Sequence, residues 1–182
     1  CMVEQEAHVQ MKLDHPNVCR LLGFFSSSVT GYLAFELCDG GDLADLLHAD
    51  GGVAARNVSF YMVQLLDAVA YIHSRGVTHR DVKPQNVLLS SKERDRNVTL
   101  KLADFGLSGA CPPGGSLKGF GTTPYMSPEQ LLGFCNESCD VWACGCILFE
   151  LLFPGQLLLG THGSTPEQAF KFMRSAWFER EV

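Results

Sequence analysis

The sequence lacks three features that would place the protein in common classes. No apolar run approaches the roughly 18 residues that a membrane-spanning helix needs, so the pattern predicts no membrane protein. Basic residues are few, because 14 Lys and Arg stand against 20 Asp and Glu, for a net charge of -6. Proteins that bind nucleic acids or acidic membrane surfaces usually carry the opposite balance, so we expect neither partner. Repeats and low-complexity tracts are also missing, and 46% apolar residues suffice for one sizeable core.

The eight cysteines contain no CxxC pair. Most of them lie in apolar runs, which is typical of reduced, buried thiols, and there is no secretory signal pattern. We therefore expect a cytoplasmic protein. A structural zinc site stays open as an alternative, although the usual paired spacing of its ligands is missing. Its ligands would be Cys135, Cys139, Cys144 and Cys146.

Hydrophobic spacing predicts a small mixed part followed by a mostly helical part. The clearest helix covers 58–76, because its apolar residues recur at steps of three and four and Gly76 can end it. A helix over 141–152 is apolar on every side, so we expect it to be buried and to end at Pro154. Residues 105–129 are predicted to be a loop. The other predicted elements are helices at 3–13, 40–48 and 165–176 and two hairpins with strands at 18–25, 31–38, 86–91 and 98–104.

Four polar residues around the second hairpin point to phosphate chemistry. Asp81, Lys83 and Asn86 lie beside apolar runs, where an unpaired charge would be costly to bury. Asn86 and Asp104 offer the oxygen ligands that Mg²⁺ prefers. Asp81 can orient an attacking hydroxyl, and Lys83 supplies positive charge for a phosphoryl group in transit. Together they predict phosphoryl transfer to an alcohol.

Four motifs in this order resemble those of the eukaryotic protein kinase catalytic domain. They are "HRDVKPQN" at 79–86, "DFG" at 104–106, "SPE" at 127–129 and "DVWACGC" at 140–146. The resemblance implies an α+β, two-lobed protein kinase-like fold that is partial, since it begins at the family's helix C and stops near helix G. It implies the remainder of the small lobe at 1–37, and the hinge and a truncated large lobe at 38–182.

The resemblance also implies ATP and Mg²⁺ as cofactors and a role for each site residue. Asp81 would orient the acceptor hydroxyl, assisted by Lys83 and Thr122, while Asn86 and Asp104 would hold the metal.

The nucleotide pocket is implied in the same way. Its Glu6 would pair with a lysine of strand three, and a solvated helix glutamate is the alternative. Its Asp42 would lie near the ribose, and a helix N-cap is the alternative, although both roles are compatible. The hinge would offer backbone groups to the adenine. The residues implied are Glu6, Phe35, Glu36, Cys38, Asp42 and Leu88.

A regulatory spine is implied by four further positions. Leu21, His79 and Phe105 would stack, and Asp140 would anchor them. The top of the spine falls on Gln10, where the family prefers an apolar residue. Whether the methionine that follows Gln10 takes its place stays open.

Lys83, two residues after Asp81, and the pair Gly121-Thr122 resemble the serine/threonine type. The run "QMKLDHPNVCRLLGFF" at 10–25 is most similar to the calcium/calmodulin-dependent and calcium-dependent kinases. We therefore expect ATP-dependent phosphorylation of serine or threonine in protein substrates, with calcium- or calmodulin-linked regulation outside these residues. The alternative is a pseudokinase or scaffold module that keeps the fold without catalysis. We expect the 182 residues alone to be inactive, since they lack a Gly-rich loop and a strand-three lysine.

The activation segment carries Lys118 where the family usually has a phosphorylated residue. Beside Arg80, this lysine adds positive charge instead of neutralising it. We expect the segment to be ordered without phosphate, and phosphorylation of Ser116 stays open as the alternative.

Overall fold

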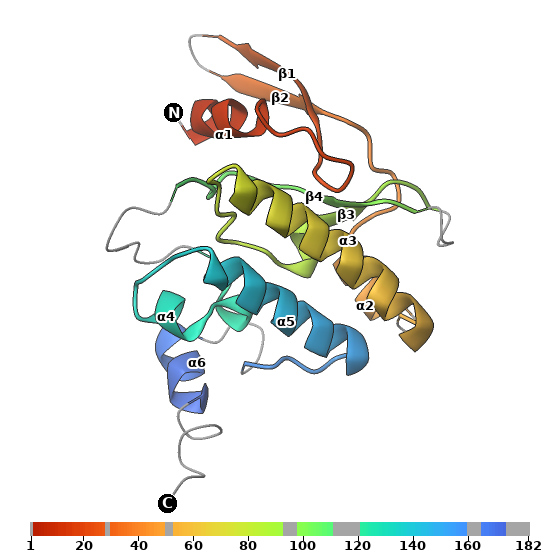
Figure 1. The fold of residues 1–182 in the computed structure, drawn as a ribbon, viewed down its shortest axis with the longest axis vertical. Helices are drawn as coiled ribbons and strands as arrows, with labels where there is room; N and C mark the ends of the chain where they lie inside the picture. The colour runs from red at the N-terminus through yellow and green to blue at the C-terminus, as the bar shows by residue number, and fades with distance from the viewer. Residues whose placement is uncertain are drawn as a thin grey trace, which may run out of the picture.

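The computed structural model describes six stretches of the chain. They are residues 2–27, 30–49, 53–92, 98–110, 121–159 and 165–173. In these stretches, a unit of one helix and two strands lies above a larger, mostly helical unit (Figure 1). The predicted α+β, two-lobed fold is confirmed, whereas the boundary after residue 37 stays a prediction.

The smaller unit is a helix packed on a two-stranded antiparallel sheet. Helix α1 spans Met2–Gln10, and strands β1 (Leu21–Ser26) and β2 (Gly31–Phe35) pair in antiparallel register. Strand β1 begins later than the spacing predicts. The reason is that Val18 and Cys19 bond instead to the larger unit, where the Cys19 N–H donates to the Leu102 carbonyl at 2.8 Å.

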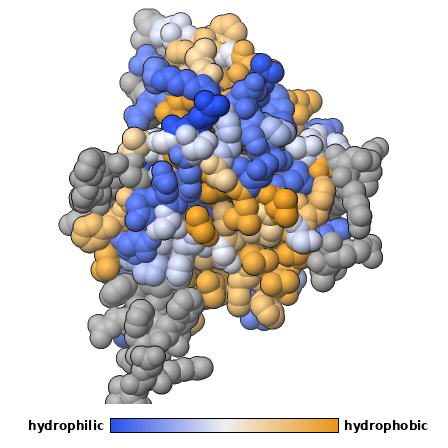
Figure 2. Space-filling model, viewed as in Figure 1, coloured by the Kyte–Doolittle hydropathy of each residue, from blue (hydrophilic) through white to orange (hydrophobic). Residues whose placement is uncertain are grey.

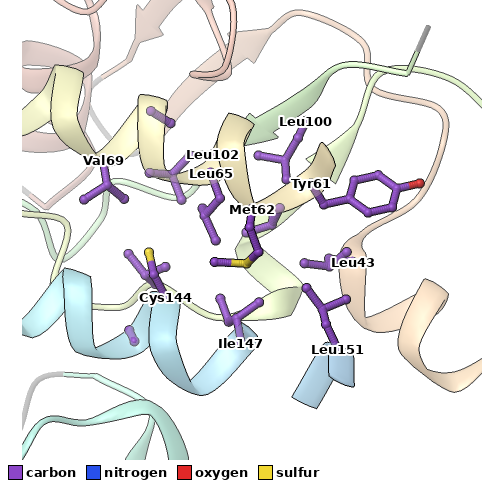
Figure 3. Packing of buried hydrophobic residues seen from close by; sticks show 14 of the residues in the cluster. Leu43, Tyr61, Met62, Leu65, Val69, Leu100, Leu102, Cys144, Ile147 and Leu151 are labelled. Carbon is purple, nitrogen blue, oxygen red and sulfur yellow. The ribbon is translucent and has the colours of Figure 1, made fainter. Parts of the chain in front are cut away.

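Helix α3 (Ala55–Ser74) is the centre of the larger unit. Its predicted apolar stripe is buried, and Leu65 and Ile72 have no exposed surface. Figure 3 shows this stripe between helix α5 (Ser138–Leu152) and strand β4 (Leu100–Leu102). Because each fully buried Leu or Ile stabilises the fold by about 1.5–3 kcal/mol, this cluster fixes the three elements against one another.

The remaining elements are short and have local signals in the sequence. Gly76 takes a left-handed φ of 69° after α3, as its predicted role as a C-cap requires. None of the helices that the structure describes is both long enough and apolar enough to span a bilayer. The short elements are α2 (Leu43–His48), α4 (Pro128–Leu131), α6 (Pro166–Met173) and the 3₁₀ turns η1 (Pro84–Asn86) and η2 (Thr123–Tyr125).

Strand β3 (Val87–Leu89) pairs with β4 and thereby gathers two polar positions. Val87 lies opposite Leu102, so Asn86 before one strand and Asp104 after the other leave the hairpin at the same end. The Ala103 N–H also donates to the Asn86 carbonyl at 2.8 Å. The predicted hairpin is confirmed, and it brings together residues that are far apart in the sequence.

Two sequence predictions for the last third of the chain were wrong. Helix α5 is not buried on every side, because Val141, Leu148 and Leu152 are 53%, 37% and 50% exposed. Figure 2 shows apolar side chains gathered on the surface over α5. Composition reports how apolar a helix is but not which face has a neighbour. The predicted loop at 105–129 also contains η2 and the start of α4, which are too short to show a periodicity.

Asp140 joins α5 to the loop that follows α3. Its side chain is 1% exposed and accepts three hydrogen bonds of 2.8 Å. The donors are the backbone N–H groups of His79 and Arg80 and the Nε2 of His73. Arg80 has a φ of 72°, a conformation that is unfavourable for a residue with a side chain. The carboxylate therefore holds a strained turn in place.

We expect Asp140→Ala to lower the free energy of unfolding by about 3–5 kcal/mol, because it leaves buried donors without an acceptor. The free energy of unfolding of Asp140→Asn should lie between those of Asp140→Ala and wild type. The introduced amide keeps one acceptor oxygen but turns its NH₂ group toward a donor. Urea titration followed by circular dichroism measures both. The control is Glu137→Ala, which changes an exposed residue whose side chain caps nothing. Equal stability of all three variants would contradict the role of Asp140.

Candidate active site

Asp81 lies at the centre of a closed hydrogen-bond triangle. Lys83 Nζ donates to Asp81 Oδ2 at 2.7 Å, and Thr122 Oγ1 donates to Asp81 Oδ1 at 2.7 Å. The third side joins Lys83 Nζ to Thr122 Oγ1 at 3.0 Å. The carboxylate is 9% exposed, so its charge is balanced by the ammonium group of Lys83 in a site with little water.

Asn86 connects this triangle to the hairpin. Its Nδ2 donates to the Asp81 backbone carbonyl at 2.9 Å and lies 3.4 Å from Asp81 Oδ2. These two contacts fix the orientation of the Asn86 amide through its nitrogen. Its Oδ1 takes part in no hydrogen bond within the described stretches. An oriented amide oxygen with no protein donor is suited to a hard cation.

Asp104 presents the second oxygen group, from a strained backbone. Its φ is 63°, and its exposed carboxylate accepts only a 3.3 Å bond from the Gly106 N–H among the described residues. A Cβ on Gly106 would lie 3.3 Å from Asp104 Oδ1 and 3.6 Å from Glu6 Oε2, so both carboxylates border this glycine. Asn86 and Asp104 line one cavity, and their oxygens match the ligand set of Mg²⁺.

The cavity has a volume of about 360 Å³, within the range of small-molecule sites. One end is polar, with Asn86 and Asp104, and the other is walled by apolar side chains. At the apolar end, the Glu36 carbonyl and the Cys38 N–H make no backbone hydrogen bond within the described stretches. A flat base with donors and acceptors on its edge fits such a wall, so the residues present fit a nucleotide. The lining residues are Glu6, Cys19, Phe35, Glu36, Gln85, Asn86, Leu88, Ala103 and Asp104.

Not every predicted pocket residue turns its side chain to the cavity. The Glu36 carboxylate is held by Lys101 Nζ at 2.9 Å and by the Arg20 N–H at 2.7 Å, so only its backbone is available to a ligand. Asp42 does not line the cavity. It caps α2, where its Oδ1 accepts from the Asp45 N–H at 2.8 Å, which is the alternative the sequence allowed. Cys38 lies behind the lining, with its thiol hydrogen-bonded to that of Cys19.

Three of the four spine positions, His79, Phe105 and Asp140, lie together, and the place of Leu21 in the stack stays a prediction. His79 and Phe105 are buried, with ring centroids 4.8 Å apart in an edge-to-face contact. His79 Nε2 donates to the Ala103 carbonyl at 3.0 Å, so this ring ties the loop of Asp81 to the segment that carries Asp104. Gln10 is 1% exposed, whereas Met11 is 64% exposed and does not replace it.

The sequence analysis missed several lining residues because they carry no charge. Cys19, Gln85 and Ala103 line the cavity, although Cys19 was noted only as a buried thiol. Their one signal is position, since Gln85 and Cys19 lie inside the quoted segments 79–86 and 10–25 and Ala103 directly precedes "DFG". Ser116 and Lys118 of the activation segment lie outside the described residues.

The cysteines proposed as zinc ligands do not gather into one site. Cys135 Sγ and Cys139 Sγ are 3.4 Å apart, and burial raises the pKa of the Cys144 and Cys146 thiols to about 12. Within the described stretches, no three His, Cys, Asp or Glu side chains form a metal-binding group.

The half-buried Glu6 supplies a pH prediction. Burial, and then the charge of Asp104, raise the pKa of Glu6 above its ordinary value of 4.5. The unfolded chain has the ordinary pKa and the folded chain has the raised pKa. At pH values between the two, the folded chain binds more protons than the unfolded chain, so the free energy of unfolding falls as the pH rises. Glu6→Gln should remove this fall. Asp104→Asn should reduce it only in part, because burial is the larger cause.

Urea titrations from about pH 4 to about pH 8 test this, with the difference from wild type as the readout. The free energy of unfolding of Glu6→Gln should increase relative to that of wild type as the pH rises. A difference that stays constant across this range would contradict the raised pKa.

Comparison with known proteins agrees with this geometry. Residues 2–178 match the family described as "Protein kinase domain". The chain is 41% identical over 152 residues to calcium/calmodulin-dependent protein kinase type II of Caenorhabditis briggsae, covering 82% of this chain and 28% of that protein. It is 36% identical over 187 residues to the serine/threonine-protein kinase RAD53 of Saccharomyces cerevisiae, covering 93% and 22%. Calcium-dependent protein kinase 5 of Plasmodium berghei is 33% identical over 151 residues, covering 82% and 26%.

The chain thus spans less than a third of the length of each of these relatives. The predicted resemblance to serine/threonine kinases near the calcium-dependent group is confirmed, and the chain belongs to the protein kinase family.

Proposed function

We propose that this chain carries the catalytic centre for ATP-dependent phosphorylation of serine or threonine hydroxyls in protein substrates. The observation that carries the proposal is the triangle of Asp81, Lys83 and Thr122, which Asn86 joins to a cavity that fits a nucleotide. It combines a carboxylate in a fixed orientation with a positive charge less than 3 Å from it.

Asp81 orients the acceptor hydroxyl and accepts its proton. Because Lys83 and Thr122 each bond one of its oxygens, the carboxylate has one rotamer and keeps its remaining lone pairs for the substrate. Lys83 offsets the negative charge that gathers near the transferred group. The resemblance implies that Thr122 assists Asp81, and its bond to Asp81 aligns the base with the acceptor.

Asn86 and Asp104 hold Mg²⁺ through their oxygens in this proposal. Mg-ATP, when bound, supplies the phosphoryl group and the metal charge that screens it. Phe35 and Leu88, which line the cavity, pack against the adenine in this proposal. The Glu36 carbonyl and the Cys38 N–H are assigned to the edge of the base. Glu6 keeps an ionisable carboxylate at the polar end for the partner lysine that the family supplies.

The substrate and the regulator belong to the whole protein. Two of the relatives are named for calcium or calmodulin, and this supports regulation of that kind outside the chain. The non-catalytic alternative makes a different forecast for turnover, since a scaffold shows no phosphorylation that could depend on the Asp81 carboxylate.

Two matched substitutions separate the proposed roles in a full-length protein that contains this chain. Asp81→Asn should lower kcat by roughly 10²–10⁴-fold with Mg-ATP affinity nearly unchanged, because it removes a base and not a ligand. Asp104→Asn should abolish turnover and also weaken Mg-ATP binding, since it removes a metal ligand. Steady-state kinetics and calorimetry with Mg-ATP measure the two effects.

The control is Asp67→Asn, which changes an exposed carboxylate on α3 whose side chain is 63% accessible. It should match wild type in both measurements. Equal weakening of Mg-ATP binding by Asp81→Asn and Asp104→Asn would refute the division of roles. Full activity of Asp81→Asn would refute the role of Asp81 as the base, whereas a wild type that binds Mg-ATP without phosphorylating serine or threonine would favour the scaffold.

A further inference from the structure

The Arg80 peptide, next to Asp81, is held at both ends in its strained conformation. Its φ of 72° is unfavourable for a residue with a side chain, so it persists only where its surroundings hold it. The Arg80 N–H donates to Asp140 Oδ1 at 2.8 Å. The Arg80 carbonyl accepts from Gln130 Nε2 at 3.0 Å. The carbonyl belongs to the peptide plane that leads into Asp81, so Gln130 acts on the residue proposed as the base.

Gln130 can present only a donor to this carbonyl. Its side chain is 8% exposed and belongs to a capping box at the start of α4. Within the box, its Oε1 accepts from the Ser127 N–H at 3.3 Å, and its own N–H donates to Ser127 Oγ at 3.3 Å. Because the Ser127 N–H occupies the oxygen, the NH₂ group must face Arg80.

A third segment closes over the same hydrogen bond. A Cβ on Gly121 would lie 2.9 Å from the Arg80 carbonyl oxygen and 3.1 Å from Gln130 Nε2. Gly121 also has a φ of 112°, so glycine is needed here for both space and conformation. The next residue is Thr122, which bonds Asp81 and Lys83. The Gln130–Arg80 bond therefore lies where the Asp81 loop, the Thr122 segment and α4 meet.

We propose that Gln130 is a positioning residue for Asp81. It holds the Arg80–Asp81 peptide in the orientation that sends the carboxylate to Lys83 and Thr122. Loss of the donor lets this peptide rotate, and a misplaced base lowers kcat without changing the nucleotide cavity, which Gln130 does not line. The proposal rests on the proposed phosphotransferase function.

The competing explanation is that Gln130 serves only the capping box of α4. The substitution Gln130→Glu separates the two, because a carboxylate still accepts from the Ser127 N–H but cannot donate to the Arg80 carbonyl. A protonated carboxyl can donate again. Burial and the facing carbonyl dipole raise the pKa of the introduced carboxyl, which brings its titration toward neutral pH.

The chain offers a matched control in α6. Gln168 forms the same kind of box with Thr165, with bonds of 2.8 Å and 3.3 Å, but it is exposed. Gln168→Glu repeats the chemical change at a cap that does not touch the catalytic loop. Gln130→Met keeps the length of the side chain and has no donor at any pH.

The titratable groups around the introduced carboxyl are shared with wild type. Expressing each rate relative to wild type at the same pH therefore removes their contribution. On helix α4, the titratable residue next to position 130 is Glu129, which accepts from Ser138 Oγ at 2.8 Å. The groups that line the small cavity with Gln130 are Arg80, Asp81, Tyr125, Cys139 and Asp140, and Glu167 of α6 lines a second cavity with it.

The experiment measures kcat and the KM for ATP of full-length protein from about pH 6 to about pH 8.5. Gln130→Glu should lose about 10- to 100-fold in kcat at the alkaline end, with KM for ATP unchanged, and should recover toward wild type as the pH falls. Gln130→Met should lose kcat equally at every pH, and Gln168→Glu should match wild type throughout.

Five outcomes overturn the inference. A Gln130→Glu profile parallel to wild type, or full activity of Gln130→Met, assigns Gln130 to the cap alone. A loss shared by Gln168→Glu assigns the effect to capping in general. An equal rise in KM for ATP places the damage in the cavity. An inactive wild type that binds Mg-ATP is distinguishable from these, because it overturns the proposed function and this inference with it.

Discussion

The buried carboxylate of Asp140 is the interaction on which the rest of the site depends. It takes two consecutive backbone N–H groups, those of His79 and Arg80, and so keeps Arg80 in a conformation that is costly on its own. The carboxylate is itself fixed because α5 is packed into the core through α3. Apolar burial has no preferred direction, but it fixes α5 and therefore the Asp140 carboxylate. The hydrogen bonds from Asp140 then fix the orientation of the loop that carries the adjacent Asp81.

The charges of the site are distributed unevenly around this frame. Asp81 has its counter-charge built in, since Lys83 lies 2.7 Å away. Glu6 and Asp104 border the nucleotide cavity, and burial, followed by the charge of Asp104, raises the pKa of Glu6. The Asp81 carboxylate thus has a counter-charge of its own, whereas the cavity presents carboxylates that attract cations. This division matches the proposed reaction, in which Mg²⁺ would bind at the cavity and a neutral hydroxyl is activated.

Much of the fold could be predicted from the sequence where the signal is local. The stripe of α3 and the caps Gly76 and Thr165 require only residues within one or two turns. The candidate site was predictable for charged residues in compact motifs, such as Asp81 and Asp104. The exposure of one face of α5 was not, because it depends on what packs there. Gln130 was missed for a similar reason, since its partner Arg80 lies 50 residues away and a glutamine has no charge to mark it.

The separation in sequence of these contacts has a consequence for synthesis on the ribosome. Asp140 follows His79 by 61 residues, and Thr122 follows Asp81 by 41. At about 5–20 residues per second, the nascent chain carries the Asp81 loop for about 3–12 s before Asp140 is even polymerised. During this interval the N–H groups of His79 and Arg80 have no protein acceptor, because Asp140 has not been made. Helix α3 and the β3–β4 hairpin are already complete in sequence before Asp140 is added. The catalytic geometry is therefore a late event of folding, which keeps a partly made chain without an assembled site.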